Sequence, residues 1–480
     1  MDIKKLEPKI IWKNFEALNS VPRPSKKEEK IIAFIKDFGE SLDLETSVDE
    51  IGNVLIKKPA TQGMEDRETI VMQAHLDMVC QKNNDVDFDF DTQGIQMYVD
   101  GDWVKAKGTT LGADNGLGVA SIMSVLESSD IPHPAIEALF TVDEETGMTG
   151  AFGLKPGMLT GNILLNLDTE EDDEIDIGCA GGVDVTANQS YETHNVSGEL
   201  VEIQVKGLKG GHSGMDIIKG LGNANKILAR LLLLGVNKGL ELVEIDGGGL
   251  RNAIPREAKA VIKIQNQEAF LQELEHLKSE IKEEFQTLEK DLDIVTEKID
   301  AEGQALSYEN SVKIVRAINA AHNGVFRMSP DVDGLVEASN NVARVKLKEG
   351  KFQVQNLTRS SVESSKFDCA NQLKSVFELA GVDVEFSGSY PGWKPKPGAE
   401  IIKIMEKIYE KDFGEKPQIV ACHAGLECGI IGANYPKMEM VSFGPTIRGA
   451  HSPDERASIK STQKFWKYLK EILANIPHKK

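Results

Sequence analysis

Three acidic residues follow one apolar stretch without a gap in ALFTVDEETG, residues 138–147. The apolar half predicts a buried strand, and Asp143, Glu144 and Glu145 come directly after it. Adjacent carboxylates at the end of a core strand repel one another and are costly to desolvate. Divalent cations remove that cost by neutralising the charge. The segment therefore favours metal-ion chemistry.

The two glutamates have different roles only if the chain turns at this point, because adjacent strand residues point to opposite faces. Thr146-Gly147 is a turn signal that follows them directly. For Asp143 we expect a solvated position or a structural hydrogen bond.

A histidine and an aspartate stand two residues apart in the apolar segment VMQAHLDMV, at His75 and Asp77. On a strand this spacing places both side chains on one face. A lone histidine near a core is more often structural than a metal ligand. A carboxylate on the same face makes a metal-ligand role for the histidine more plausible, because a metal-bound imidazole needs a partner that fixes its orientation.

Three further segments carry single ligand-type residues, each with an ordinary alternative. Asp114 opens a helix in GTTLGADNGLGVA, which is typical of a helix cap. Asp168 ends an apolar run in NLDTEE, as a cap or turn residue would, and His451 stands in the loop RGAHSPDE. Each signal is weak alone. Two histidines with several carboxylates are nevertheless a ligand set that zinc accepts.

The elements that position these residues alternate between strands and helices in the first third of the chain. Alternation of this kind predicts an α/β sheet buried on both faces, with functional groups just past the carboxyl ends of the strands. The segments are a helix over 26–42, a strand over 68–79, a helix over 115–128, and strands over 135–142 and 161–168.

The texture changes near Val185, where the polar, turn-rich stretch 187–200 begins. Helical patterns interleaved with alternating strands then predict two consecutive α+β units of about 100 residues each. A Pro/Gly-rich stretch at 387–400 is typical of a linker, and α/β texture resumes after it. We expect one α/β domain interrupted by a large insertion. The helical patterns cover 220–234, 267–285, 307–322 and 364–381, and the strands 200–207, 258–265 and 351–359.

Composition limits the partners of this 480-residue chain. Its net charge of −21 and pI near 5.0 argue against nucleic acid and anionic membranes. The N-terminal segment lacks a signal-peptide core, and the apolar run around Arg230 is too short to span a bilayer, so we expect a cytoplasmic protein. Five cysteines without a CxxC pair indicate neither a disulfide framework nor a cysteine-based zinc site.

The motifs HLD, GADNG, DEETG, NLD and GAHSPDE, in this order from Val71 to Glu455, resemble the dinuclear zinc peptidases that include carnosinases, bacterial dipeptidases and acetyl-amino-acid deacylases. QAHLDMV, KAKGTTLGADNG and GCAGG are most similar to the aminoacyl-histidine dipeptidase branch. The resemblance implies a three-layer α/β catalytic domain with a mixed central sheet, formed by residues 1–187 and 398–480. It is interrupted by an α+β lid domain of two ferredoxin-like units, residues 188–397.

The same resemblance implies two Zn²⁺ ions per chain, with Mn²⁺ or Co²⁺ as possible substitutes. His75 and Asp168 would bind one ion, Glu145 and His451 the other, and Asp114 both.

Asp77 would orient His75, and Glu144 would be the general base. One carboxylate between two ions suits the spacing of about 3.5–4 Å that two-metal hydrolases use. A water between the ions loses its proton easily, and a free carboxylate nearby passes it to the leaving amine.

The lid would supply the remaining groups. By resemblance, His212 in LKGGHSGMD donates to the developing oxyanion on lid closure, the alternative being a turn histidine. In some relatives this donor comes from a neighbouring subunit, which allows a homodimer through the lid. Arg251, Asn252 and Arg359 are candidates for binding a substrate carboxylate. A surface salt bridge is the commoner role of an arginine.

The loop CHAGLECG adds Glu427, a candidate receptor for the free amino group of a dipeptide. For His423 in the same loop, the alternative to a role in substrate binding is a purely structural one.

We therefore expect a zinc metallopeptidase that cleaves unblocked dipeptides, preferentially carnosine-like Xaa-His. A tripeptide aminopeptidase or an N-acyl amino acid deacylase would use the same metal site. A two-metal phosphoesterase ranks lower, because the sequence has no P-loop and no clear phosphate-binding basic cluster. A non-catalytic binding protein on this fold could lack the general base. Because Glu144 is present, an active enzyme is the better hypothesis.

Overall fold

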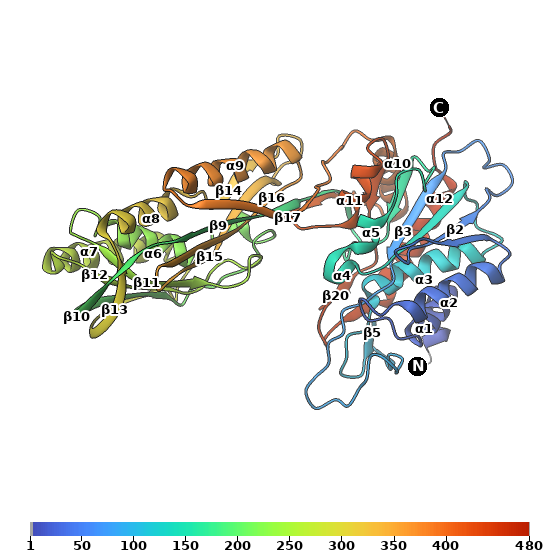
Figure 1. Cartoon of the computed structure of the whole chain (residues 1–480). Helices are drawn as coiled ribbons and strands as arrows, with labels where there is room; N and C mark the ends of the chain where they lie inside the picture. The colour runs from blue at the N-terminus through green and yellow to red at the C-terminus, as the bar shows by residue number, and fades with distance from the viewer. Residues whose placement is uncertain (1–2, 480) are drawn as a thin grey trace. The chain divides into compact units, whose positions relative to one another are not determined.

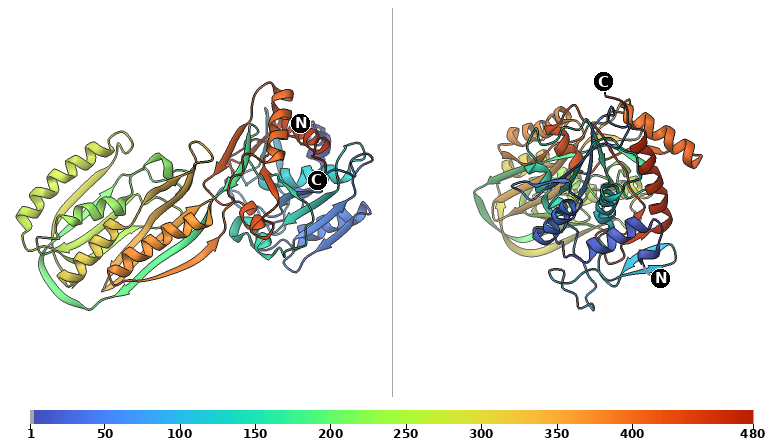
Figure 2. Two further views of the ribbon diagram at one scale, coloured as in Figure 1. Left: turned by 90° about the horizontal axis from the view of Figure 1, so that it is seen from above. Right: turned by 90° about the vertical axis from the view of Figure 1, so that its right-hand side faces the viewer.

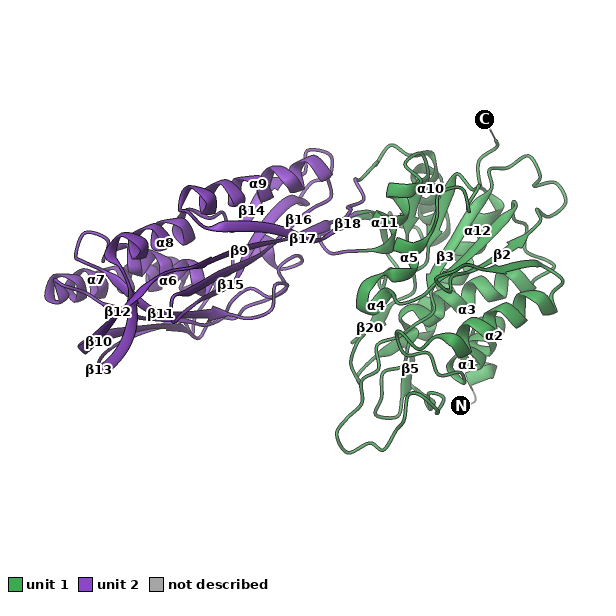
Figure 3. Cartoon of the chain, viewed as in Figure 1, with its two compact units in different colours: residues 1–178, 395–421, 426–480 green, residues 179–394, 422–425 purple. Residues whose placement is uncertain are grey.

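The computed structural model describes residues 3–479 and divides into two compact units (Figure 3). Unit 2 comprises Cys179–Lys394 and Cys422–Gly425, and unit 1 is the remainder. The division falls before the expected boundary at 187/188, because strand β9 (Gly181–Ser190) pairs along its whole length with β16 (Lys351–Ser360) of unit 2.

Unit 1 is built on an eight-stranded sheet of order β1-β2-β6-β3-β7-β19-β8-β18 (Figure 1). The pairs β3–β6, β3–β7 and β7–β19 are parallel, whereas β1–β2, β2–β6 and β19–β8 are antiparallel. The expected mixed central sheet is confirmed. Its strands are β1 (Glu45–Val48), β2 (Val54–Lys58), β3 (Ile70–His75), β6 (Ile136–Thr141), β7 (Ile163–Asn166), β8 (Glu174–Cys179), β18 (Gln418–Cys422) and β19 (Glu439–Ser442).

Every residue of the central strands β3, β6 and β7 is buried. Because successive strand residues point to opposite sides, both faces of the sheet are covered there. Helix α3 packs on β3, α2 on β1 and β2, and α10 on β19. The helices are α1 (Lys9–Asn19), α2 (Glu29–Ser41), α3 (Ala113–Glu127), α4 (Glu144–Gly147), α5 (Thr149–Gly153), α10 (Glu400–Phe413), α11 (Glu427–Asn434) and α12 (Ile459–Ala474).

A second, four-stranded sheet in unit 1 has the order β20-β21-β5-β4. Strands β20 and β21 form a hairpin, and β21 pairs with β5, which shortly precedes the α3 helix. This sheet therefore joins the C-terminal segment to the segment that leads into α3. Its strands are β4 (Met97–Asp100), β5 (Trp103–Ala106), β20 (Ile447–Arg448) and β21 (Arg456–Ser458).

Unit 2 has one nine-stranded sheet of order β13-β10-β12-β11-β15-β16-β9-β17, with β14 paired to β15. Its four helices share a single apolar core with the strands and therefore lie on one face of the sheet (Figure 2). The elements not yet given are β10 (Thr193–Lys206), α6 (Ala224–Leu233), β11 (Glu241–Gly248), β12 (Ala258–Lys263), α7 (Gln267–Phe285), β13 (Asp293–Leu306), α8 (Tyr308–Ala320), β14 (Gly324–Met328), β15 (Val336–Lys348), α9 (Glu363–Leu379) and β17 (Asp383–Tyr390).

The two halves of this sheet are nested in the chain, whereas the sequence predicted consecutive units. One half runs β10-α6-β11-β12-α7-β13 without interruption. The other half combines β9, which precedes it in the chain, with α8, β15, β16, α9 and β17, which follow it. Sequence periodicity does not show which strands pair, so the nesting was not visible from it.

Two stretches expected to be turns or linkers contain strand. The polar stretch 187–200 lies mostly in β9 and β10, with a turn only between Ser190 and Thr193. The start of 387–400 belongs to β17, and Trp393 is buried and bridges to Cys179. Strands that expose polar side chains on one face resemble turns in composition.

None of the helices among residues 3–479 is long and apolar enough to cross a membrane.

Candidate metal centre

Strand β3 ends at His75, whose side chain is buried at the carboxyl end of the sheet. Its Nδ1 atom lies 3.4 Å from Oδ1 of Asp77. Its Nε2 atom lies 3.2 Å from Oδ1 of Asp114 and 3.5 Å from Oδ1 of Asp168. Asp77 stands just beyond the strand, yet it keeps the expected position beside the imidazole.

Asp114 lies between two imidazoles. While Oδ1 faces His75, Oδ2 lies 3.1 Å from Nε2 of His451. That Nε2 atom is also 3.0 Å from Oε2 of Glu145. The helix-cap alternative for Asp114 is wrong, because the N-cap of α3 is Gly112 and the Asp114 backbone is not helical. One carboxylate between two imidazoles could hold two cations at once.

The chain turns at the acidic segment, one residue before the two glutamates. Asp143 has a left-handed backbone (φ 52°, ψ 46°), and the short helix α4 begins at Glu144. The Asp143 carboxylate accepts the hydroxyls of Thr146 and Thr149, so its expected structural hydrogen bond is confirmed. The turn itself lies at Asp143 and not at the Thr-Gly signal.

Asp77 also holds this turn. Its Oδ1 accepts the backbone N–H of Glu144 at 3.0 Å, and its Oδ2 that of Glu145 at 3.2 Å. The hydroxyl of Ser25 donates to Oδ2 at 2.7 Å. Burial favours the neutral acid, but the hydrogen bonds from His75, Ser25 and the Glu144 N–H lower the pKa of Asp77 to about 2.

The electrostatics of the cluster fit bound cations. Burial raises the pKa of Glu144 well above its usual range and that of Asp168 to about 6. Hydrogen bonds to Asp114 and Glu145 raise the pKa of His451 to about 11. Oε1 of Glu145 is buried without a hydrogen-bond partner. An orphaned carboxylate oxygen among further acids is compensated by a cation, so the donor set fits a pair of divalent ions.

Three of these residues offer ligand atoms within 4.8 Å of one another, namely His75, Asp114 and Glu145. Asp168 and His451 adjoin this group through the contacts given above. The structure thus brings together all seven residues for which metal or proton chemistry was predicted. They are His75, Asp77, Asp114, Glu144, Glu145, Asp168 and His451.

Sequence reasoning missed Arg23, which is buried beneath the same loops. Its guanidinium donates to the backbone oxygens of Leu76 and Asp77, and to that of Gly112 at 2.5 Å. The segment VPRPS has no pattern that predicts this role. Only the position of Arg23 between two distant loops reveals it.

Glu427, the first residue of α11, is almost fully buried in unit 1. Its Oε2 accepts Nε2 of Gln73 at 2.6 Å and Oγ1 of Thr141 at 2.7 Å, while Oε1 has no partner. Burial raises the pKa of Glu427 to about 7. It is therefore a buried carboxyl group with one free oxygen, bound to side chains of β3 and β6, the strands that end at the cluster.

In unit 2, the ring of His212 is fixed by its own turn. Nδ1 accepts the backbone N–H of Gly214 at 3.2 Å and of Met215 at 3.1 Å. The neutral ring therefore carries its proton on Nε2. Burial lowers the pKa of His212, which favours this neutral form. The backbone oxygen of Asn252 accepts the Ser213 N–H at 2.8 Å, so the His212 and Asn252 loops are adjacent.

The two arginines differ in their partners. Arg359 is only 5% exposed and donates to the Tyr390 hydroxyl at 3.0 Å. No carboxylate oxygen of the described chain lies within 4.0 Å of Arg359. Arg251 has Nε 3.1 Å from Oδ2 of Asp184, so its salt-bridge alternative is confirmed. A buried cation without an anionic partner is unusual, and Arg359 is the better anion receptor of the two.

His423 is buried in unit 2, with Nε2 2.7 Å from Oγ of Ser339 and Nδ1 without a partner. Burial lowers the pKa of His423 to about 3, so the ring is neutral.

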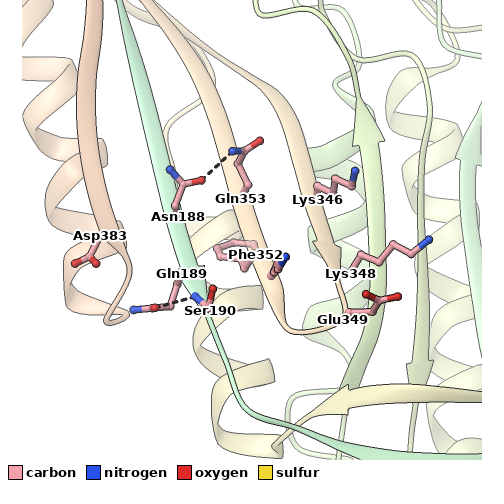
Figure 4. A pocket seen from close by; sticks show the side chains of 10 residues that line it. Asn188, Gln189, Ser190, Lys346, Lys348, Glu349, Phe352, Gln353 and Asp383 are labelled. Carbon is pink, nitrogen blue, oxygen red and sulfur yellow. Dashed lines mark hydrogen bonds between the residues drawn. The ribbon is translucent and has the colours of Figure 1, made fainter.

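An open pocket of ≈ 610 Å³ lies elsewhere in unit 2 (Figure 4). It is lined mainly by polar and charged side chains, and none of the predicted site residues lines it. The amide of Gln353 donates to Asn188 on the neighbouring strand at 2.9 Å. Its size alone therefore does not connect it to the chemistry of the acidic cluster.

Known proteins resemble this chain over its whole length. Residues 71–475 match the model of Peptidase family M20/M25/M40. The chain is 43% identical, over 100% of both lengths, to the cytosol non-specific dipeptidase of Escherichia coli (strain K12). The crystal structure of aminoacylhistidine dipeptidase from Vibrio alginolyticus has a TM-score of 0.96 and 45% identity, covering 100% of this chain and 99% of that one. Aminopeptidase PepT from Bacillus cereus has a TM-score of 0.58 and 17% identity over 98% and 99%, a likeness in fold alone.

Proposed function

This chain belongs to peptidase family M20/M25/M40, and on that premise we propose that it hydrolyses unblocked dipeptides with two divalent metal ions. It is an enzyme of the dipeptidase class, as its full-length similarity to two dipeptidases indicates. The observation that carries the proposal is the position of Asp114, with one carboxylate oxygen toward His75 and the other toward His451.

These contacts support the proposed ligand assignment. His75 and Asp168 would hold one ion, Glu145 and His451 would hold the other, and Asp114 would be a ligand of both. The orphaned Oε1 of Glu145 supports its role as a ligand. Zinc is the proposed metal, with Mn²⁺ or Co²⁺ as substitutes. When bound, such a pair lowers the pKa of a water molecule and polarises the amide carbonyl.

Glu144 moves the proton. Its backbone N–H is held by Asp77, and no hydrogen bond of the described chain occupies its carboxylate. The raised pKa of Glu144 suits a group that takes a proton from water and gives it to the leaving amine. Asp77 keeps the His75 ring and the Glu144 backbone in a fixed relation and takes no proton itself, in agreement with its lowered pKa.

The remaining groups bind the substrate. His212 donates from Nε2 to the developing oxyanion, and Arg359 binds the substrate carboxylate, with Asn252 beside His212. Glu427 receives the free amino group through its unpaired Oε1. Unit 2 is then the lid domain, whose two halves have the strand order of ferredoxin-like units. We also propose cytosolic function, as in the Escherichia coli relative, and a homodimer through the lid.

The substrate preference is the finer part of the proposal. The Vibrio relative is named for histidine-containing dipeptides, which supports a preference for Xaa-His. The Escherichia coli relative is named a non-specific dipeptidase, which supports a broad range. Tripeptide aminopeptidase and N-acyl amino acid deacylase activity are the alternatives on the same metal site.

One assay separates these activities. Zinc-loaded protein is given β-Ala-His, several Xaa-His and Xaa-Leu dipeptides, a tripeptide, and an N-acetyl amino acid. We expect turnover of the dipeptides, fastest for Xaa-His. Equal rates for Xaa-His and Xaa-Leu would remove the histidine preference, and cleavage of the acetylated compound alone would refute the dipeptidase proposal.

A further inference from the structure

The carboxylate of Glu455 accepts four successive backbone N–H groups. Its Oε2 accepts Leu111 N at 2.7 Å and Gly112 N at 2.9 Å. Its Oε1 accepts Ala113 N at 2.7 Å and Asp114 N at 3.3 Å. Successive N–H groups that converge on one anion form a backbone nest, here at the start of helix α3. The anion is a side chain of the protein itself.

Glu455 is not a metal ligand in this arrangement. Both of its oxygens are occupied by N–H groups, and the side chain is only 2% exposed. Hydrogen bonds to an ionised carboxylate are about twice as strong as neutral ones, and four of them fix the backbone of the loop. The last of the four belongs to Asp114, the residue that lies between the two histidines.

Arg23 holds the same loop through its carbonyl groups. The guanidinium donates to Gly112 O at 2.5 Å and to Leu76 O at 3.1 Å, next to His75. Gly112 has φ 69°, and a Cβ atom there would clash with the Nη2 atom of Arg23. The loop therefore needs glycine at this position, and Arg23 and Glu455 bind its opposite polar groups.

Glu455 stands four residues after His451, in the segment between β20 and β21. One carboxylate thus ties the segment that carries His451 to the segment that carries Asp114. The contact spans 341 positions of the chain. The sheet β20-β21-β5-β4 joins the same two segments further from the cluster, but no ligand residue takes part in its pairing.

From this geometry we infer that Glu455 is a positioning residue. It sets the distance between Asp114 and His451. It thereby sets the affinity of the site for the second metal ion, the one that His451 would bind. The inference rests on the two-ion site of the proposed function. It does not depend on which peptide is cleaved.

The test uses the full-length protein after removal of metal by a chelator. Zn²⁺ binding is titrated by calorimetry, and the coupling between two Mn²⁺ ions is followed by electron paramagnetic resonance. The variants are Glu455→Gln, which turns an N–H donor toward the nest, and Glu455→Asp, which keeps the charge but shortens the side chain. The matched control is Glu137→Gln, because Glu137 is a buried glutamate that binds the N–H groups of Thr160 and Gly161.

Residues that orient metal ligands typically contribute about 10–100-fold to metal affinity. We expect both Glu455 variants to bind the second ion at least tenfold more weakly and to lose the coupled Mn²⁺ signal. The control variant should keep both properties, even if its urea unfolding midpoint falls as far as that of the Glu455 variants. Glu455→Asp supplies the result if Glu455→Gln does not fold.

Wild-type ion affinity in either folded Glu455 variant would overturn the inference, as would an equal loss in Glu137→Gln. The proposed function fails separately, if the wild-type protein binds two ions but cleaves no dipeptide. In that case the ion affinities of the variants still decide the role of Glu455.

Discussion

The Oδ1 atom of Asp77 lies 3.4 Å from the Nδ1 atom of His75. The same carboxylate accepts the backbone N–H groups of Glu144 and Glu145. One buried side chain therefore sets both the orientation of an imidazole and the turn that separates the two glutamates. A change at Asp77 is expected to affect the ligand and the base together.

Replacing Asp77 with asparagine tests this dual role. The amide cannot accept both backbone N–H groups and gives His75 a weaker partner, so metal affinity should fall by about 10–100-fold, with a lower kcat. Calorimetric Zn²⁺ titration and steady-state kinetics measure the two effects. The control is Ser25→Ala, which removes only the hydroxyl bond to Asp77. An Asp77→Asn variant with wild-type metal affinity would contradict the assignment.

The different roles proposed for the adjacent glutamates can be distinguished by experiment. Glu144→Gln removes proton transfer but no ligand, so kcat should fall by about 10²–10⁴-fold while metal content stays at the wild-type value. Glu145→Gln should lower both metal content and activity, because the ion proposed to bind Glu145 and His451 loses one of these two ligands. Metal analysis beside kcat distinguishes the two variants. Loss of metal from Glu144→Gln would make Glu144 a ligand.

Arg359 and Arg251 form a matched pair for substrate binding. Arg359→Met should raise KM at least tenfold for dipeptides with a free carboxylate, but not for the corresponding C-terminal amides. Its stability should be unchanged or higher, since a buried unpaired charge is removed. Arg251→Met should leave KM unchanged and lower stability, because Asp184 loses its partner. KM and urea unfolding measure both effects, and the reverse pattern would transfer the anion-binding role to Arg251.

Asp176 should make stability depend on pH. Burial raises the pKa of this carboxyl to about 6, above the value of about 3.9 expected in the unfolded chain. The folded state therefore holds more protons between these values, and stability falls as pH rises from about 4 to about 6.

Asp176→Asn removes this titration. The variant should match the wild type near pH 4 and exceed it by about 2–3 kcal/mol at pH 7, from the same difference in pKa. Urea unfolding at both pH values measures the difference. A variant less stable than the wild type at pH 7 would show that the carboxylate itself stabilises the fold, through its bond to Thr169.

Residue type and chain order were enough to group most of the candidate metal ligands, and the family resemblance supplied their expected roles. His75, Asp114, Glu145, Asp168 and His451 are ligand-type residues. His75 lies in a predicted strand, Asp168 ends one and Glu145 follows one. Since strand ends in an α/β sheet meet at one edge, these residues could be grouped without knowledge of their contacts. The turn at Asp143 was anticipated only in part, because a left-handed aspartate has no sequence signature comparable to glycine.

The sequence by itself determined the donor set, the α/β class and the family resemblance, because these depend on residue type, spacing and local periodicity. Tertiary structure alone decided that Glu455 binds the Asp114 loop, that Arg23 lies beneath it, and that the two halves of the unit 2 sheet are nested. Each of these is a contact between segments far apart in the chain. Such contacts depend on how the strands pair and the loops meet, and they leave no periodic mark on either segment.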